Sequence, residues 1–327
     1  MNDINIENPL LPFIFVGCWN AKGAGRKAVI KAINRHPVTN LVLGGDNFYP
    51  IKKKTPAGKI KSYDVRLLKP HLFKKDVVTA LGNHNIDVFK NADGNKQEVL
   101  ELEKKMGWRI PAEPPYYYIV RYTDLDLMIL DTNLCDPEYE DKDAFNTMLE
   151  WMQQYLVSKD KQYYCVMHEP IISAKIKNSK EKLKDSSIIQ ELSKSREILS
   201  VLTTSPPIAI LCADTHNYQQ VFITYNGVTI PQIVVGTGGA DPDTVDWSKY
   251  TVDTPLGDDI VFSIAWPSKE EKEAYGFAVF DTDGRHTFQY VRPWDFKGGS
   301  RKRVRRNRQT KRRRNKIMAS LNLNHNR

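Results

Sequence analysis

Side chains that can bind metal ions follow five short apolar runs of this sequence. They are Cys18, Asp46, Tyr49, Asn83, His84, His168, Asp214 and His216. Carboxylate, amide oxygen, phenolate and imidazole are hard to borderline donors that suit Fe, Zn or Mn, and a cysteine thiolate binds Zn or Fe. A single residue of this kind is more often a turn former or a core residue, but the recurrence predicts a centre of two metal ions.

The apolar runs predict the strands that must position these side chains. They are 13–16, 41–43, 77–81, 163–167 and 208–212, and their length and glycine-rich or polar ends are typical of buried strands. Ligands collect at the carboxyl ends of strands in α/β sheets, so we expect these five ends to converge at one edge. Four later runs predict a second sheet: 221–225, 228–235, 276–280 and 286–291. With helical patterns between the runs, the sequence predicts an α/β fold of two packed β-sheets flanked by helices.

In their order and spacing, these residues resemble the purple acid phosphatases. The matching pieces are Gly45-Asp46-Asn47-Phe48-Tyr49, Gly82-Asn83-His84, His168 and His216-Asn217-Tyr218. The similarity is strongest to the short, tartrate-resistant form within the calcineurin-like metallophosphoesterases, and it extends over about residues 12–290. It implies a metallophosphoesterase-like sandwich with an αββα order of layers.

The resemblance also implies a ligand set for each metal ion. The first ion would be held by Cys18, Asp46, Tyr49 and His216, and the second by Asp46, Asn83, His168 and Asp214, with Asp46 bridging the two. The family has an Asp at position 18 and the first His of a Gly-His-x-His motif at position 214. The thiolate lowers the preference for Fe(III), and the added carboxylate weakens the pull on a phosphate anion. Asn85 stands where the family has an acidic residue that orients a ligand.

The implied activity is hydrolysis of phosphomonoesters by a hydroxide held by two ions of Fe, Zn or Mn. His84 would be catalytic, either stabilising the phosphoryl group or donating a proton to the leaving oxygen. The alternative hypothesis is a catalytically degenerate phosphatase fold that serves as a nucleic-acid-binding or virion structural protein. Bound metal and turnover of an aryl phosphate favour the enzyme, whereas an empty site with salt-sensitive DNA binding favours the alternative.

Positive charge is concentrated at the end of the chain. Residues 297–327 contain thirteen Lys and Arg and no acidic residue, so subtracting them from the net charge of +9 leaves −4 for residues 1–296. The length of 327 residues suits one large α/β domain, and we predict the metallophosphoesterase-like domain at 1–296 and a disordered basic tail at 297–327.

The tail and a second basic segment suggest anionic partners. Residues 301–316 carry closely spaced cations without aromatic residues, which predicts binding of nucleic acid without sequence preference. A nuclear import signal fits the same residues, and the tail has a compositional resemblance to tails of proteins packaged in large DNA virus particles. Residues 51–62 contain five lysines and are expected to form a basic loop that either steers an anionic substrate or is simply solvated.

The N-terminal residues and the cysteines indicate an intracellular protein. Residues 1–10 lack the basic start of a signal peptide, and the apolar run that follows is too short for a membrane helix. The four cysteines show no disulfide framework. We therefore expect a protein that is not secreted and does not bind a membrane, with nuclear or virion association possible through the tail.

Overall fold

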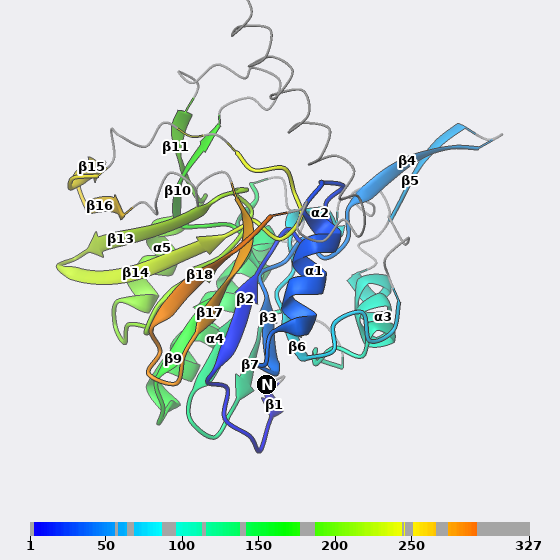
Figure 1. Ribbon diagram of the computed structural model, residues 1–327. Coiled ribbons are helices and arrows are strands. Elements are labelled where there is room, and N and C mark those ends of the chain that lie inside the picture. Colours follow the sequence, from blue (N-terminus) through cyan, green and yellow to red (C-terminus); the bar gives the residue numbers. More distant parts are fainter. Residues whose placement is uncertain are drawn as a thin grey trace, which may run out of the picture.

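Two β-sheets that pack face to face form the centre of the protein in a computed structural model of the chain (Figure 1). The structure describes residues 3–55, 58–63, 69–86, 96–112, 116–137, 142–176, 187–243, 245, 251–265 and 274–292. The predicted tail at 297–327, including the proposed nucleic-acid segment at 301–316, lies outside these residues.

The larger sheet has nine strands in the order β1-β7-β8-β9-β12-β14-β13-β16-β15. In sequence order these are β1 Asp3–Asn5, β7 Tyr118–Arg121, β8 Asp126–Ile129, β9 Tyr163–Val166, β12 Ile210–Cys212, β13 Tyr218–Tyr225, β14 Val228–Val235, β15 Thr254–Leu256 and β16 Ile260–Ala265. The central strands β8, β9, β12 and β14 are parallel neighbours. The side chains of β8, β9 and β12 are all buried, as expected for strands that are covered on both faces.

The smaller sheet has five strands in the order β18-β17-β2-β3-β6. They are β2 Phe13–Val16, β3 Asn40–Leu43, β6 Asp76–Thr79, β17 Tyr275–Phe280 and β18 His286–Val291. Strands β2, β3 and β6 are parallel, and β17 pairs antiparallel with β2. The prediction of two packed sheets is confirmed, but the grouping of the four late strands is wrong. Strands β13 and β14 extend the larger sheet while β17 and β18 complete the smaller one, because apolar patterns do not specify pairing between distant segments.

Aromatic rings fill the space between the two sheets. Tyr164 of β9 lies edge-on to Phe13 of β2 and to Phe280 of β17, with ring centroids 5.5 Å away in both cases. Phe13 and Phe280 are themselves stacked at 4.4 Å. These three fully or almost fully buried rings lie in a core that contains residues of both sheets. The burial of such large rings is a major stabilising term for the docked sheets.

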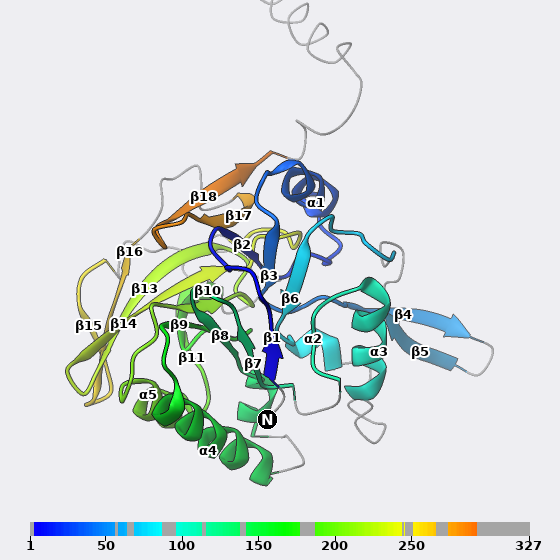
Figure 2. The same ribbon diagram turned by 90° about the horizontal axis from the view of Figure 1, so that it is seen from below.

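The described helices are α1 Arg26–Arg35, α2 Asn83–Ile86, α3 Lys96–Met106, α4 Lys142–Ser158 and α5 Ser195–Leu202, with a 3₁₀ helix at Thr132–Cys135. Helices α1, α4 and α5 lie on the outer faces of the sheets (Figure 2). Helix α1 contacts β17 and β18 of the smaller sheet, whereas α4 and α5 share a second core with the larger sheet. Among the described residues, none of the helices has the length and apolar character needed to cross a bilayer.

Two hairpins lie outside the sheets. One consists of β10 Ile172–Ile176 and β11 Ser187–Glu191, and the other of β4 Pro50–Thr55 and β5 Gly58–Tyr63. The second projects from the body of the protein (Figure 1). The expectation of a basic loop at 51–62 is therefore wrong, because these residues pair as an antiparallel hairpin.

Candidate metal centre

The ends of the five predicted strands meet, but they come from both sheets. Strands β2, β3 and β6 belong to the smaller sheet and β9 and β12 to the larger one. Backbone hydrogen bonds connect the loops that follow them, with the Cys18 N–H donating to Gly45 O at 3.1 Å and the Ala213 N–H to His168 O at 2.9 Å. The Gly17 N–H donates to Val235 O at 2.9 Å and so links the end of β2 to the larger sheet. The site is built where the sheets join.

Three of the predicted ligands form a compact buried cluster. One potential ligand atom each from Cys18, Asp46 and His168 lies within 4.8 Å of the other two. The His168 Nε2 is 3.3 Å from Asp46 Oδ1, and the Cys18 Sγ is 3.8 Å from Asp46 Oδ2. Ligands about 2.0–2.3 Å from one zinc ion are roughly 3–4.5 Å from one another, so these separations suit a shared ion. The donor set and its geometry therefore fit a metal.

Within the described part of the chain, two buried ligand atoms make no hydrogen bond. They are Asn83 Oδ1 and His168 Nε2. Leaving a buried polar atom unpaired costs about 1–3 kcal/mol, so two such atoms among the predicted ligands favour a cation as the missing partner. The His168 Nδ1 lies 2.7 Å from Gly44 O. Because a carbonyl oxygen only accepts, Nδ1 carries the proton and Nε2 presents its lone pair to the cluster.

Three of the candidate ligands have unusual backbone φ angles. Cys18, Asp46 and Asp214 have positive φ values of 51°, 56° and 46°. Such angles are uncommon for residues other than glycine and are often found at functional sites. Two glycines permit the close approach, since a Cβ on Gly45 would lie 2.6 Å from His168 Nδ1 and one on Gly82 would lie 2.3 Å from the Asp46 backbone nitrogen.

Burial raises the pKa values of two candidate ligands and keeps them protonated. The pKa of the Cys18 thiol is raised well above its usual value by burial and then by the charges of Asp46 and Asp214. The pKa of the Tyr49 hydroxyl is raised by burial and by Asp46. Both groups would have to lose a proton to bind a metal as anions, so a cation must compete with protons for them.

Asp214 lies between a predicted ligand and a lysine that the sequence did not single out. Its Oδ1 is 3.9 Å from His168 Nε2, and its Oδ2 is 2.8 Å from Lys175 Nζ. Burial is the largest influence on the pKa of Asp214 and acts to raise it, but the charges of Lys175, His168 and His216 and the Lys175 hydrogen bond together lower it. Burial likewise acts to lower the pKa of Lys175, but the charge and hydrogen bond of Asp214, with the charges of Asp243 and Glu169, together raise it. The two groups form a partly buried ion pair.

The remaining predicted residues lie around the cluster. The His84 ring is 4.8 Å from the Tyr49 ring, and the His84 backbone N–H donates to Asp46 Oδ1 at 3.1 Å. His216 follows Asp214 in the same loop, its backbone N–H donates to Asp243 Oδ2 at 3.3 Å, and burial lowers its pKa. The structure thus brings His84 beside Asp46 and Tyr49, whereas His216 is not part of the three-residue cluster.

A buried polar network behind Asp46 was missed by sequence reasoning. Asn85 Oδ1 accepts from the Asn47 N–H at 3.0 Å and from the Gly82 N–H at 3.2 Å. Asn85 therefore fixes the two loops that carry Asp46 and Asn83, although it lacks the charge of the family's acidic residue. The network continues to Glu103 of α3, which accepts from both Asn47 and Asn85. The sequence shows Glu103 only as one charged residue of a charged helix.

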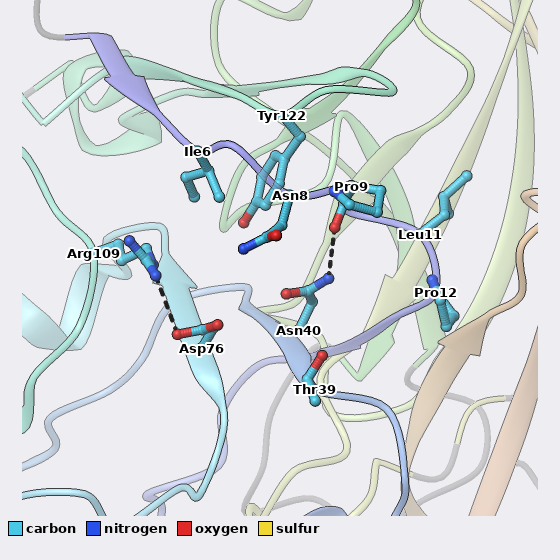
Figure 3. Close-up of a pocket in the computed structure, with 10 residues that line it drawn as sticks. All are labelled: Ile6, Asn8, Pro9, Leu11, Pro12, Thr39, Asn40, Asp76, Arg109 and Tyr122. Atoms are coloured by element: carbon cyan, nitrogen blue, oxygen red, sulfur yellow. Dashed lines mark hydrogen bonds and ion pairs between the residues drawn. The ribbon is translucent and has the colours of Figure 1, made fainter.

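A cavity of about 300 Å³ lies at the opposite edge of the smaller sheet. Its lining includes Asn40 and Asp76, which begin β3 and β6, whereas the metal-binding candidates follow the ends of these strands. Figure 3 shows the Arg109–Asp76 ion pair and the hydrogen bond from Asn40 to Pro9 O. Their atoms are 3.3 Å and 3.1 Å apart. The lining contains none of the candidate metal ligands, so this cavity is separate from the cluster at Asp46.

Comparisons with known proteins support the fold. Scanning the sequence against models of protein families gives no match, and no curated protein matches it. Among solved structures, one similar protein is purple acid phosphatase PPD1 from yellow lupin (Lupinus luteus) seeds, with a TM-score of 0.53 and 14% identity over 87% of this chain. The chain spans 54% of that phosphatase.

A second similar structure is GAP50, described as the anchor in the inner membrane complex of Plasmodium. It has a TM-score of 0.50 and 17% identity, covering 88% of this chain and 86% of the other. The protein has a purple acid phosphatase-like fold. The expected metallophosphoesterase-like architecture is thereby confirmed, and at these identities the likeness concerns the fold alone.

Proposed function

We propose that this protein is a metal-dependent phosphoesterase that hydrolyses phosphomonoesters. The observation that carries the proposal is the pair of buried ligand atoms without hydrogen bonds, Asn83 Oδ1 and His168 Nε2, at the Cys18–Asp46–His168 cluster. Burying unpaired ligand atoms destabilises the folded protein unless a cation binds to them. The purple acid phosphatase-like fold supports the same chemistry.

The resemblance assigns a role to each group. One ion would be bound by Cys18, Asp46, Tyr49 and His216. The second would be bound by Asp46, Asn83, His168 and Asp214. Metal ions bound there would polarise the phosphoryl oxygens and lower the pKa of a water molecule. The His168 Nδ1 contact with Gly44 O orients the imidazole, and the Asn85 bonds hold the loops on both sides of Asp46.

His84 is the residue we propose for proton transfer to the leaving oxygen. Its backbone N–H donates to Asp46 Oδ1, which places α2 against the cluster, and its partly exposed ring lies beside that of Tyr49. A side chain that is held at the site yet open to solvent can reach a substrate. A general acid of this kind contributes about 10²–10⁴-fold to a rate.

The test combines elemental analysis with turnover of an aryl phosphate, using protein purified without chelator from cells supplied with Fe, Zn and Mn. Asp46→Asn should lower both metal content and turnover, whereas His84→Asn should lower turnover and keep the metal. Asp76→Asn is the matched control, because this carboxylate begins β6 at the opposite edge of the same sheet. Wild-type protein without metal would sink the proposal.

A nucleic-acid-binding or structural role on a degenerate phosphatase fold is the second candidate. The observation that favours it is the Lys175–Asp214 ion pair, which engages one proposed ligand of the second ion. GAP50 is described as an anchor, so this fold also occurs in a protein with that description. Metal-free protein without phosphatase turnover that binds DNA through residues 301–316 would support this candidate.

A further inference from the structure

Lys175 is a cation paired with a residue that is expected to hold the second metal ion. It lies on β10, and its Nζ is 2.8 Å from Asp214 Oδ2. The other oxygen of that carboxylate faces His168 Nε2 at 3.9 Å. Asp214 and His168 are both proposed ligands of the second ion, so the ammonium group shares a carboxylate with that site.

Strand β10 is fixed in position, so Lys175 is not an incidental surface lysine. The Ser173 and Thr215 hydroxyls are hydrogen-bonded at 2.9 Å, and both residues are fully buried. The Ala174 N–H donates to Gln219 Oε1 at 3.0 Å, and Gln219 Nε2 donates back to Ala174 O at 2.9 Å. These bonds hold the backbone before Lys175 against the segment that contains Asp214.

Asp214 already has a positive partner in Lys175, whose Nζ donates to its Oδ2 at 2.8 Å. The side chain of Asp214 is 12% exposed and that of Lys175 32%, so solvent screens this pair only in part. A divalent ion beside Asp214 would meet the fixed positive charge of Lys175 at short range, and like charges at such a distance repel strongly when they are partly buried.

We propose that the Lys175 ammonium group takes the place of the second metal ion, so that the site combines one metal ion with one lysine. This inference rests on the proposed function. The single ion would be held by Cys18, Asp46 and His168, whose ligand atoms lie together. In this arrangement His168, which the resemblance gives to the second ion, would bind the only ion present. An ammonium group has three donors, and one is used on Asp214. A compact point charge of this kind can also bind a phosphate oxygen.

The test is the number of metal ions bound per chain. Wild-type protein is stripped with chelator, dialysed against Zn²⁺ or Mn²⁺, freed of excess ions and analysed by elemental analysis. We expect about one ion per chain in the wild type and about two in Lys175→Met, which keeps every proposed ligand and removes only the competing charge. Lys175→Arg keeps the charge and should keep one ion.

Lys161→Met is the matched control, because Lys161 is also partly buried but donates to Tyr122 O at 2.7 Å, outside the site. It should bind one ion, like the wild type. Two ions in the wild type, or equal numbers in the wild type and Lys175→Met, would overturn the inference while leaving the phosphoesterase proposal intact. No ion in any variant would instead overturn both. If Lys175→Met does not fold by circular dichroism, the wild-type number still decides between one ion and two.

Discussion

The carboxyl group of Glu103 accepts a hydrogen bond from Asn47 Nδ2 at 3.0 Å, which ties helix α3 to the residue that follows Asp46. Glu103 is 1% exposed, and Asn85 Nδ2 approaches the same oxygen at 3.4 Å. Burial raises the pKa of Glu103 to about 8, although the Asn47 hydrogen bond acts to lower it. An acidic side chain that stays protonated at neutral pH therefore supports the loop of the candidate site.

The raised pKa of Glu103 should make the free energy of unfolding depend on pH. In the unfolded chain this group ionises above about pH 4.5, whereas in the folded protein it keeps its proton until about pH 8. Between these values the unfolded state binds fewer protons, so the contribution of Glu103 to the free energy of unfolding falls as pH rises, by at most about 1.4 kcal/mol per pH unit. Glu103→Gln keeps the acceptor oxygen and should remove this decline, as measured by urea unfolding from pH 5 to 9.

Glu101→Gln is the control for this measurement. Glu101 lies on the same helix, but its side chain is 47% exposed and pairs with Lys104. It should leave the pH dependence as in the wild type. A Glu103→Gln variant with the wild-type decline between pH 5 and 8 would show that Glu103 does not hold its proton in the folded protein.

Gly45 and Gly227 form a matched pair for testing the close approach at the cluster. Both have positive φ, 91° and 78°, but a Cβ on Gly45 would lie 2.6 Å from His168 Nδ1 while one on Gly227 would meet no atom within 4 Å. Gly227→Ala should lower the free energy of unfolding by about 1–2 kcal/mol, through backbone strain alone. Gly45→Ala should cost more and also reduce bound metal, because His168 must move. Equal losses of stability, together with unchanged metal content, would contradict the role of Gly45.

Cys18 should control which metal is bound. Replacing its soft thiolate by a hard carboxylate favours Fe(III) over Zn, so Cys18→Asp should raise the ratio of iron to zinc severalfold. Elemental analysis of protein from cells supplied with both metals measures this ratio. Cys135→Ser, which changes another buried cysteine outside the cluster, should not alter it. An unchanged ratio in Cys18→Asp would remove Cys18 from the proposed ligands.

The basic segment 297–327 should bind nucleic acid independently of the rest of the chain. If six of its thirteen cationic residues contact phosphates, duplex DNA affinity should fall roughly a thousandfold between about 50 and 200 mM salt. Deleting 297–327 should abolish this binding and leave turnover of an aryl phosphate unchanged. Equal DNA affinity of the full-length and truncated chains would move the interaction to the lysines of the β4–β5 hairpin.

Local sequence was sufficient to predict the strands that carry the site. The run before Asp46 is β3, and those before Cys18, Asn83, His168 and Asp214 are β2, β6, β9 and β12. Fully buried parallel strands need apolar residues on both faces, so they give short continuous runs that are easily recognised. The residues after such a run are then placed at the sheet edge by chain continuity alone.

Properties that depend on distant pairing could not be predicted in this way. Strand β17 pairs with β2 although the two strands are far apart in the sequence. Neither apolar run contains a pattern that predicts which strand it pairs with. Lys175 is one lysine among several in its segment, and only the docking of β10 against the loop at Thr215 brings it to Asp214. The burial of Glu103 could not be predicted for the same reason, since it arises from the packing of α3 behind Asn47.

Because the cluster is divided between the two sheets, binding of an ion there would be linked to folding. Cys18 and Asp46 follow strands of the smaller sheet, and His168 follows a strand of the larger one. A ligand that requires all three binds only after the sheets have docked, so by mass action it must hold them together. The affinity for the ion then depends on the stability of the docked sheets. Resistance to proteolysis should therefore rise with the concentration of free metal.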